Sequence, residues 1–376
     1  MNRADPLSFY EFFAGGGMAR AGLGTGWRCL FANDFDPLKT RVYRDNWGGE
    51  DLRAGDVWAL DATDLPRRAD LAWASSPCQD LSLAGARAGL EGGRSSALWG
   101  FWRLIEALDG EGRAPRCLVI ENVVGLLTSR GGTDFHTLCA ALAGRGYRYG
   151  AVEIDAAAFL PQSRPRVFLI AAREPPDLME QGPFHSRAVV EAFYRLPAEL
   201  RTHWLWWRLP RPPDRNTDLA ALLEPDEAVA WHTKAQTERL LSLMSEVHLA
   251  KLRKAQARGE RVVGALFRRV RIEAGVKRQR AEVRFDGVAG CLRTPRGGSS
   301  RQTVVIIESG VVRTLLISAR EGARLMGLPD DFRLTKGATA GLKVVGDGVA
   351  APVVRFLARH LLEPLLAQAP VPVAAE

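Results

Sequence analysis

The opening of the chain places the narrowest limits on its fold. Residues 7–13 form an apolar run typical of a buried β-strand, and an Ala-Gly-Gly-Gly turn comes next at residues 14–17. A short helix is predicted after the turn, over residues 18–23. Strand, glycine turn and helix in this order begin a nucleotide-binding α/β unit, in which glycines let a ligand approach the backbone. Because many glycine triplets are simply turns, this prediction needs support from the neighbouring strands.

Acidic residues stand at the expected places. A second apolar strand, residues 27–32, runs into Asn33 and Asp34. Asp34 lies 19 residues after Gly15, close to the spacing of about 20 at which an acid reaches ribose hydroxyls. Asp56 comes directly after Gly55 in another predicted turn. The pattern predicts a nucleotide-like ligand at the ends of these strands.

Cys78 stands at the end of a third strand, residues 71–74, directly after Pro77. Proline cannot donate to a sheet ladder, so the strand ends there. Open α/β sheets bind ligands at strand ends, and the glycine-rich segment 81–97 has the length of a lid or binding loop. A thiol in this position is a candidate nucleophile, although a lone cysteine is more often a small buried hydrophobe.

A fourth strand, residues 117–120, ends in Glu121 and Asn122. Because the carboxyl ends of parallel strands meet at one edge of a sheet, we expect Cys78 and Glu121 to face the same crevice. Further strands are predicted over residues 151–154 and 167–171. The segment between them carries three alternating polar residues, Gln162, Arg164 and Arg166.

Composition excludes several classes of protein. The 376 residues have 47% hydrophobic and 25% charged side chains, ordinary for a soluble chain of one large or two modest domains. No apolar run reaches transmembrane length, and the first six residues do not predict a signal peptide. The five cysteines are scattered and lack Cys-x-x-Cys spacing, which argues against disulfides or a zinc site. We therefore expect a cytoplasmic protein with no metal and no membrane association.

Positive charge is concentrated in one stretch. Residues 251–284 hold 12 Lys and Arg against 3 Asp and Glu, whereas the whole chain has a net charge of +8. Arginine accounts for 44 of the 51 basic residues, and its guanidinium fork suits phosphates and guanine edges. The stretch predicts contact with nucleic acid, with a solvated helix face as the alternative.

Together these pieces resemble the DNA cytosine-5 methyltransferases, which act with S-adenosylmethionine. The matching motifs, in chain order, are residues 13–17, Asp34-Phe35, Asp56, Pro77-Cys78-Gln79, Ser82 to Leu98 with Arg94, Glu121-Asn122-Val123, Gln162-x-Arg164-x-Arg166, Arg293-Thr294 and residues 325–329. The resemblance covers residues 1–173 and 293–363, and the shared order makes it specific.

The resemblance implies an α/β fold: a Rossmann-like S-adenosylmethionine-dependent methyltransferase fold with a mixed, mostly parallel sheet and a smaller target-recognition domain. It implies Cys78 as nucleophile, Glu121 as the group that bonds the base, and Arg164 and Arg166 as cations near the base. The implied cofactor-binding residues are Phe13, Ala14, Gly15, Gly17, Asp34, Phe35, Asp56, Pro77, Leu98, Asp347 and Val349. The implied DNA-binding residues are Gln79, Ser82, Arg94, Gln162, Arg268, Arg269, Arg271 and Arg293.

Two positions depart from the family pattern. Met18 stands where a third glycine is common, and Asp347 stands where asparagine is usual, in Gly346-Asp347-Gly348. If Asp347 lines the amino-acid end of the cofactor, its carboxylate would repel the cofactor carboxylate and attract its amine.

The predicted domains are a catalytic cofactor-binding domain over residues 1–175, a target-recognition domain over 176–292, a return to the catalytic domain over 293–368, and a disordered tail over 369–376. The boundary near residue 175 rests on Glu174-Pro175-Pro176. Beyond it, three tryptophans at 204, 206 and 207 form either a small core or a base-stacking platform.

The predicted function is methylation of carbon 5 of cytosine in a specific double-stranded DNA sequence. The target base would be flipped out of the duplex, and Cys78 would attack its carbon 6. We expect a monomer whose partners are duplex DNA and a restriction endonuclease encoded nearby.

Three alternatives remain open. The first is the same chemistry on transfer RNA, against which a recognition segment of more than one hundred residues argues. The second is a non-catalytic DNA-binding regulator, which the presence of Cys78, Glu121 and Arg166 disfavours. The third is a nicotinamide dehydrogenase, which the thiol at a strand end and the Gln/Arg motif disfavour.

Overall fold

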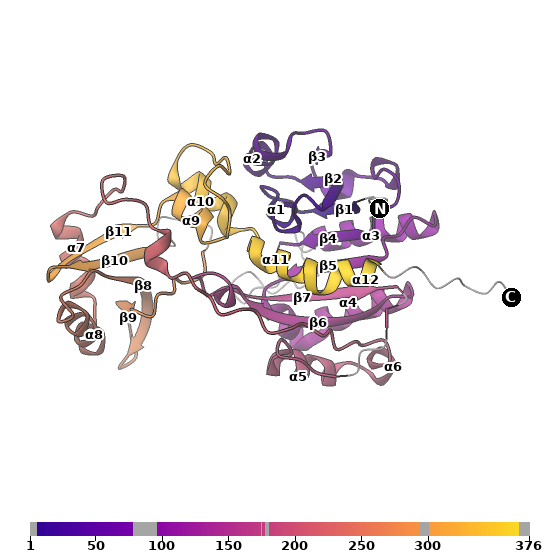
Figure 1. Cartoon of the computed structure of the whole chain (residues 1–376). Helices are drawn as coiled ribbons and strands as arrows, with labels where there is room; N and C mark the ends of the chain where they lie inside the picture. Colours follow the sequence, from indigo (N-terminus) through magenta and orange to yellow (C-terminus); the bar gives the residue numbers. More distant parts are fainter. Residues whose placement is uncertain (1–5, 78–95, 174, 177–179, 293–300, 368–376) are drawn as a thin grey trace. The chain divides into compact units, whose positions relative to one another are not determined.

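The computed structural model describes residues 6–77, 96–173, 175–176, 180–292 and 301–367 (Figure 1). The chain divides into two compact units. Unit 1 comprises Met1–Asp155, Pro165–Pro212 and Gly348–Glu376, and unit 2 comprises Ala156–Arg164 and Pro213–Asp347.

Unit 1 is built on a seven-stranded sheet with the order β3-β2-β1-β4-β5-β7-β6. The strands are β1 (Leu7–Phe12), β2 (Trp27–Asp34), β3 (Leu52–Ala54), β4 (Leu71–Ser75), β5 (Cys117–Asn122), β6 (Arg148–Asp155) and β7 (Pro165–Ala172). β7 pairs antiparallel with β5 and with β6, and the other neighbouring strands are parallel. The predicted α/β fold with a mixed, mostly parallel sheet is confirmed.

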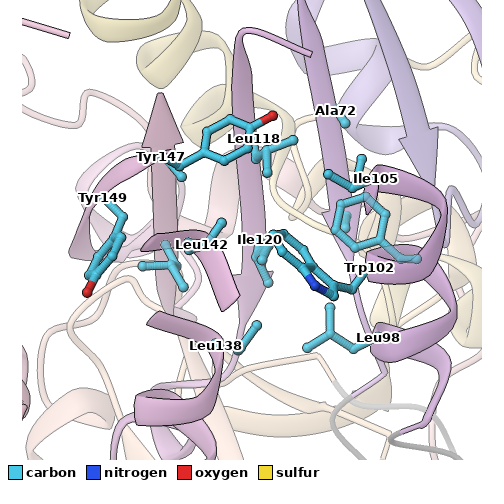
Figure 2. Close-up of a cluster of buried hydrophobic side chains, with 14 of the residues drawn as sticks. Ala72, Leu98, Trp102, Ile105, Leu118, Ile120, Leu138, Leu142, Tyr147 and Tyr149 are labelled. Carbon is cyan, nitrogen blue, oxygen red and sulfur yellow. The ribbon is translucent and has the colours of Figure 1, made fainter. Parts of the chain in front are cut away.

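Helices cover this sheet because its central strands are apolar on both sides, as parallel sheets require. They are α1 (Met18–Leu23), α2 (Pro37–Trp47), α3 (Ser96–Gly110), α4 (Thr133–Gly144), α5 (Arg187–Arg195), α6 (Ala198–Arg201), α11 (Ala351–Leu357) and α12 (Glu363–Ala367). Figure 2 shows Leu98 and Trp102 of α3, and Leu138 and Leu142 of α4, around Ile120 of β5. The two helices therefore cover the same face of the sheet.

The C-terminal segment rejoins unit 1 through a close contact between α1 and α11. A Cβ placed on Gly22 of α1 would lie 2.4 Å from Cβ of Val354 and 2.7 Å from the carbonyl oxygen of Ala351. Only glycine permits this approach, so the packing of α11 against unit 1 depends on Gly22 of α1.

An aromatic core extends unit 1 beyond the predicted boundary at residue 175. Trp204, Trp206 and Trp207 are all buried, and Trp204 packs edge-to-face against Phe135 of α4 and Tyr149 of β6. The tryptophans are thus core residues, not a base-stacking platform. Because they bury their apolar area against the sheet, the compact unit 1 runs to Pro212 and includes the first part of the segment 176–292.

Unit 2 contains a four-stranded antiparallel sheet with the order β11-β10-β8-β9. Its strands are β8 (Val262–Glu273), β9 (Val276–Arg284), β10 (Thr303–Glu308) and β11 (Val311–Leu316). Its helices are α7 (Lys234–Ser242), α8 (Glu246–Gln256), α9 (Ala319–Arg324) and α10 (Ala338–Gly346). Its core gathers Leu240, Leu252, Leu266, Val283 and Ile307.

One local prediction in unit 2 was wrong. The single helix predicted within residues 231–257 is two helices, because Thr233 and Gln236 form a capping box before α7 and a second helix starts after Ser245. Of the basic stretch 251–284, Lys251, Arg253 and Lys254 lie in α8, and the part from Val262 onward forms a β-hairpin. Unit 2 extends to Asp347. No helix within the described ranges is long and apolar enough to cross a membrane.

Candidate active site at the strand ends of unit 1

The centre of the unit 1 sheet has a topological switch between β1 and β4. These strands are neighbours and parallel, with Phe12 of β1 beside Ala74 of β4. The chain then leads from β1 to β2 on one side and from β4 to β5 on the other. Loops that leave a switch point in opposite directions open a crevice at the carboxyl ends of the strands, where α/β proteins bind ligands.

The turn after β1 has the backbone geometry of a ligand-binding turn. Phe13, Gly15 and Gly17 all have positive φ, at 57°, 59° and 81°. The turn closes through a 2.8 Å hydrogen bond from the Gly17 N–H to the carbonyl of Ala14. A Cβ on Gly15 would meet nothing within 4 Å, so this side of the turn opens onto free space. The predicted cofactor segment therefore offers bare backbone to a ligand.

Asp34 at the end of β2 holds this turn in place. It is 5% exposed, and its Oδ2 accepts a 2.9 Å hydrogen bond from the N–H of Gly15, while Oδ1 accepts one from Asp36. Burial raises the pKa of the Asp34 carboxyl, against the opposing effects of Lys39 and these N–H donors. Each carboxylate oxygen keeps a further lone pair, so Asp34 can both fix the turn and accept from a ligand hydroxyl.

A cavity of about 570 Å³ lies beside Asp34. It is lined by Phe35, Pro37, Thr40, Arg41, Arg44, Asp45, Ala54 and Gly55. Phe35 is 67% exposed, an unusual state for a phenylalanine without a partner surface. Asp56 stands next to the cavity wall and caps the short helix Val57–Ala59 through the N–H of Trp58. These residues, with the Gly15 turn, fit the size and polarity of a nucleoside.

Three other predicted cofactor residues lie in different surroundings. Leu98 is buried in the α3 core of Figure 2, and its predicted cofactor contact stays a prediction. Val349 is buried in unit 1, beyond Gly348, and a Cβ on Gly348 would lie 1.4 Å from Cε of Met18. Met18 therefore fills the space beside Gly348. Asp347 is exposed at the end of α10, in unit 2.

Glu121 and Arg166 form a buried ion pair at the ends of β5 and β7. Nε of Arg166 lies 3.1 Å from Oε1 of Glu121, and the two side chains are 16% and 7% exposed. The predicted Glu121 and Arg166 are therefore brought together.

Asn122 connects this pair to the end of β4. Its Nδ2 donates to the hydroxyl of Ser76 at 3.0 Å, and Ser75 pairs with Glu121 in the ladder between β4 and β5. Ser76 precedes Pro77, which is the last described residue before the segment 78–95. Cys78, Gln79, Ser82 and Arg94 lie outside the described residues, as does Arg293. The strand end that leads to Cys78 is thus fixed against Glu121.

The remaining cysteines of unit 1 are poor nucleophiles. Cys117 and Cys139 are fully buried, and burial raises the pKa of Cys117 to about 12. Burial also raises the pKa of Cys139 and of the partly buried Cys29. A thiol reacts as its thiolate, so none of these three competes for a nucleophilic role at neutral pH.

Two predicted site residues serve the interior of unit 2. Gln162 is fully buried, where Nε2 donates to the carbonyl of Leu325 and Oε1 accepts from the N–H of Leu292. Arg164 is 2% exposed, and its guanidinium donates to the carbonyls of Leu292 and Gly346 at 2.9 Å each. Both side chains thus bind backbone groups of unit 2, and the DNA contact of Gln162 and the catalytic cation at Arg164 stay predictions.

The sequence motifs did not single out two residues that shape this site. Asn122 belongs to a motif, and its signal is a polar residue directly after a buried strand-end acid. Trp47 belongs to none of the motifs, and its contact with the turn at Gly16 depends on the packing of α2 beside β2 and β3, for which the sequence carries no signal.

Comparison with known proteins agrees with this geometry. A family model described as C-5 cytosine-specific DNA methylase matches residues 7–363. The Type II methyltransferase M.BsuFI of Bacillus subtilis is 25% identical over 97% of this chain and 75% of its own length. M.HhaI of Haemophilus parahaemolyticus is 24% identical over 94% of each chain. The crystal structure of the S. pombe Dnmt2 methyltransferase has a similar fold, with a TM-score of 0.57 at 17% identity over 96% of this chain and 99% of that one. The chain therefore belongs to the C-5 cytosine-specific DNA methylase family and is an enzyme of that class.

Proposed function

We propose that this enzyme methylates carbon 5 of a cytosine flipped out of a specific duplex sequence, with Cys78 as nucleophile. The observation that carries the proposal is the Glu121–Arg166 pair, held by Asn122 at the strand end that leads to Cys78. Bound S-adenosylmethionine would supply an electrophilic methyl group. The turn at Gly15, Asp34 and the cavity at Phe35 would hold it.

Each residue has a distinct role in the proposed chemistry. The Cys78 thiolate adds to carbon 6 of the cytosine, which makes carbon 5 nucleophilic. As the thiolate adds, nitrogen 3 of the ring takes up a proton; Glu121 hydrogen-bonds this N–H and stabilises the protonated base, and Arg166 fixes the orientation of the Glu121 carboxylate. After methyl transfer, water accepts the carbon 5 proton, the electron pair of that C–H bond re-forms the double bond between carbons 5 and 6, and the Cys78 thiolate leaves as the proton on nitrogen 3 is released. The base must leave the duplex because its reacting atoms are otherwise inaccessible.

We further propose that the β8–β9 hairpin of unit 2 contacts the duplex. Residues 268–280 carry six basic side chains and one acidic side chain. The core of unit 2 ends at Leu266 and Ala281, so the hairpin beyond them is exposed. The major groove is about 12 Å wide and admits a two-stranded ribbon.

The two faces of this hairpin differ. On one face, Arg269 and Arg271 pair with Glu282, and Arg278 and Arg280 pair with Glu273. The opposite face, by the strand register, carries Arg268, Val270, Ile272, Lys277 and Gln279. Val270 and Ile272 are 63% and 72% exposed. We assign base contact to this second face, because aliphatic groups suit thymine methyls and its cations have no carboxylate partner among the described residues.

The decisive experiment is methyl transfer from labelled S-adenosylmethionine to mixed-sequence duplex DNA and, separately, to total transfer RNA. Bisulfite sequencing of the product gives the modified position. We expect label in one cytosine context of the DNA and none in RNA. Label in RNA alone would overturn the duplex substrate, and DNA binding without label would indicate a regulator.

Two variants test the assigned residues in the same assay. Cys78→Ala should abolish transfer while duplex binding survives, and loss of binding together with activity would make Cys78 structural. Glu121→Gln keeps the shape of the side chain but removes its charge, so transfer should fall about 10²- to 10⁴-fold. We also expect the enzyme to act as a monomer and to be encoded beside a restriction endonuclease.

A further inference from the structure

A buried polar cluster lies behind the cofactor turn and has no part in the chemistry proposed above. Its members come from β1, α1, α2 and the start of β3: Glu11, Arg20, Tyr43, Trp47 and Asp51. All of them belong to unit 1. None is a residue that the motifs assign to cofactor, base or DNA.

Trp47, the last residue of α2, contacts the turn directly. Its indole Nε1 donates a 3.0 Å hydrogen bond to the carbonyl of Gly16. A Cβ on Gly17 would lie 2.2 Å from the same nitrogen, so the indole occupies the space that a side chain would need. Gly17 also has a φ of 81°, which a side chain would strain. The indole therefore fixes both the position and the glycine content of the turn.

Arg20 holds Trp47 in place from α1. Its guanidinium lies 5.1 Å from the centre of the indole, within the range of a cation–π contact. Nη1 of Arg20 donates to the hydroxyl of Tyr43 at 2.7 Å and to Oδ2 of Asp51 at 2.5 Å. Arg20 thus links the helix after the turn to α2 and to the segment before β3.

Glu11 of β1 supplies the cap that α1 lacks. The residue before α1 is Gly17, which has no side chain to accept from the first N–H groups of the helix. Oε1 of Glu11 accepts from the N–H of Arg20, the third residue of α1, at 3.3 Å. Glu11 is 1% exposed, and within the described residues its Oε2 has no hydrogen-bonding partner. A carboxyl group is buried here, at a cost, to complete a helix whose glycine cap the ligand requires.

We propose that Trp47 is a positioning residue for the methyl donor, with Arg20 and Glu11 as its supports. Trp47 holds the Gly16 carbonyl so that the N–H groups of the turn stay aimed at the ligand. The inference rests on the proposed cofactor turn. It adds that the shape of this turn is imposed from behind by an indole that never touches the ligand.

Trp47→Phe tests the proposal, because it keeps an aromatic ring and removes the N–H donor. One such hydrogen bond contributes about 0.5–1.5 kcal/mol, so the Kd for S-adenosylmethionine should rise about 3- to 10-fold. KM for S-adenosylmethionine should rise equally, whereas kcat at saturating donor and the Kd for duplex DNA should change less than about twofold. Arg20→Lys, which keeps the charge but loses the fork, should show a smaller change in the same direction.

Trp27→Phe is the matched control. The Trp27 indole also donates one partly buried hydrogen bond, to Oε1 of Glu363 at 2.9 Å. Trp27 is the first residue of β2, so this bond lies at the amino-terminal ends of the strands, away from the turn. If both variants lost the same affinity for S-adenosylmethionine, Trp47 would contribute only to general stability, and the proposal would be overturned. Unchanged affinity in Trp47→Phe would also overturn it. Donor binding is measured by calorimetry without DNA, so wild-type protein that binds donor but methylates nothing would refute the proposed function alone.

Discussion

At the scale of single residues, burial decides what an ionisable group can do. Burial raises the pKa of Glu11 to about 8, against the N–H groups of Arg20 and Ala19 that lower it; the Arg20 charge also lowers it, and the nearby Asp51 carboxylate raises it. The same carboxyl in an unfolded chain titrates near 4.5. The folded state therefore holds a proton that the unfolded state releases, and stability from this group is lost as pH rises from about 4.5 to 8.

Glu11→Gln removes this titration and keeps an oxygen that can accept from α1. The difference in melting temperature between the variant and the wild type should grow in favour of the variant between about pH 5 and 8, then level off. Thermal unfolding across this pH range measures it. A difference that is constant with pH would show that Glu11 keeps its charge in the folded protein.

Met18 shows how a departure from a family pattern can be accommodated by one neighbour. Its methyl group lies where a Cβ of Gly348 would be. Gly348→Ala should therefore cost about 1–3 kcal/mol by overpacking, and Met18→Ala in the same chain should recover part of that loss. Urea unfolding of the two single variants and the double variant measures the coupling. If the changes in unfolding free energy of the two single variants simply added in the double variant, the Met18 side chain would move aside without cost.

At the scale of elements, the β8–β9 hairpin shows that a basic patch is not uniform. Arg271 lies against Glu282, and Glu282 has a lowered pKa because of that hydrogen bond. Arg268, on the other face, has no ion pair among the residues that the structure describes. Arg268 and Arg271 therefore carry the same formal charge but differ in how freely they can contact a phosphate. We predict that the face with Arg268 binds DNA.

Arg268→Gln should lower the slope of log affinity for duplex DNA against log salt concentration by about one unit. Arg271→Gln should lower this slope less, because the charge of Arg271 is already partly neutralised by its ion pair with Glu282. Fluorescence anisotropy at several salt concentrations gives both slopes. Equal slopes for the two variants would contradict the assignment of the faces.

At the scale of the whole molecule, two arginines two positions apart belong to different units. Arg164 ties the segment Ala156–Arg164 to the rest of unit 2 through buried backbone carbonyls, whereas Arg166 lies in unit 1 and pairs there with Glu121. One motif thus serves two purposes: Arg164 stabilises unit 2, and Arg166 orients Glu121.

Arg164→Ala leaves buried carbonyls without donors, so we expect a loss of about 2–5 kcal/mol in the free energy of unfolding, with activity lost in proportion. Arg166→Lys should leave the melting temperature within a few degrees and still lower kcat, because lysine cannot reproduce the orientation of the guanidinium. Calorimetry and kinetics on both variants separate these outcomes. A stable but inactive Arg164→Ala would support a catalytic role for Arg164.

The elements of unit 1 could be predicted closely because each has a strong local signal. The helix predicted over 18–23 is α1 to the residue, and the strands at 7–13, 71–74 and 117–120 differ from β1, β4 and β5 by one or two residues. The β8–β9 hairpin was harder to predict, because the residues on both faces beyond Leu266 are mostly charged and only Val270 and Ile272 alternate with them. Its turn has Ala274 at a φ of 48° before Gly275, where the usual hairpin signal is asparagine before glycine.

The sequence by itself determined which residue types stand at the strand ends and in what order, because the glycine turn, the strand-end acids and Pro77-Cys78 are local patterns. Only the tertiary structure decided which of them meet. Glu121 pairs with Arg166 and not with Arg164, since β7 runs antiparallel beside β5 and carries Arg166 to its end. Trp47 reaches the cofactor turn through the packing of α2. Contacts between distant segments depend on sheet order and register, which no local pattern contains.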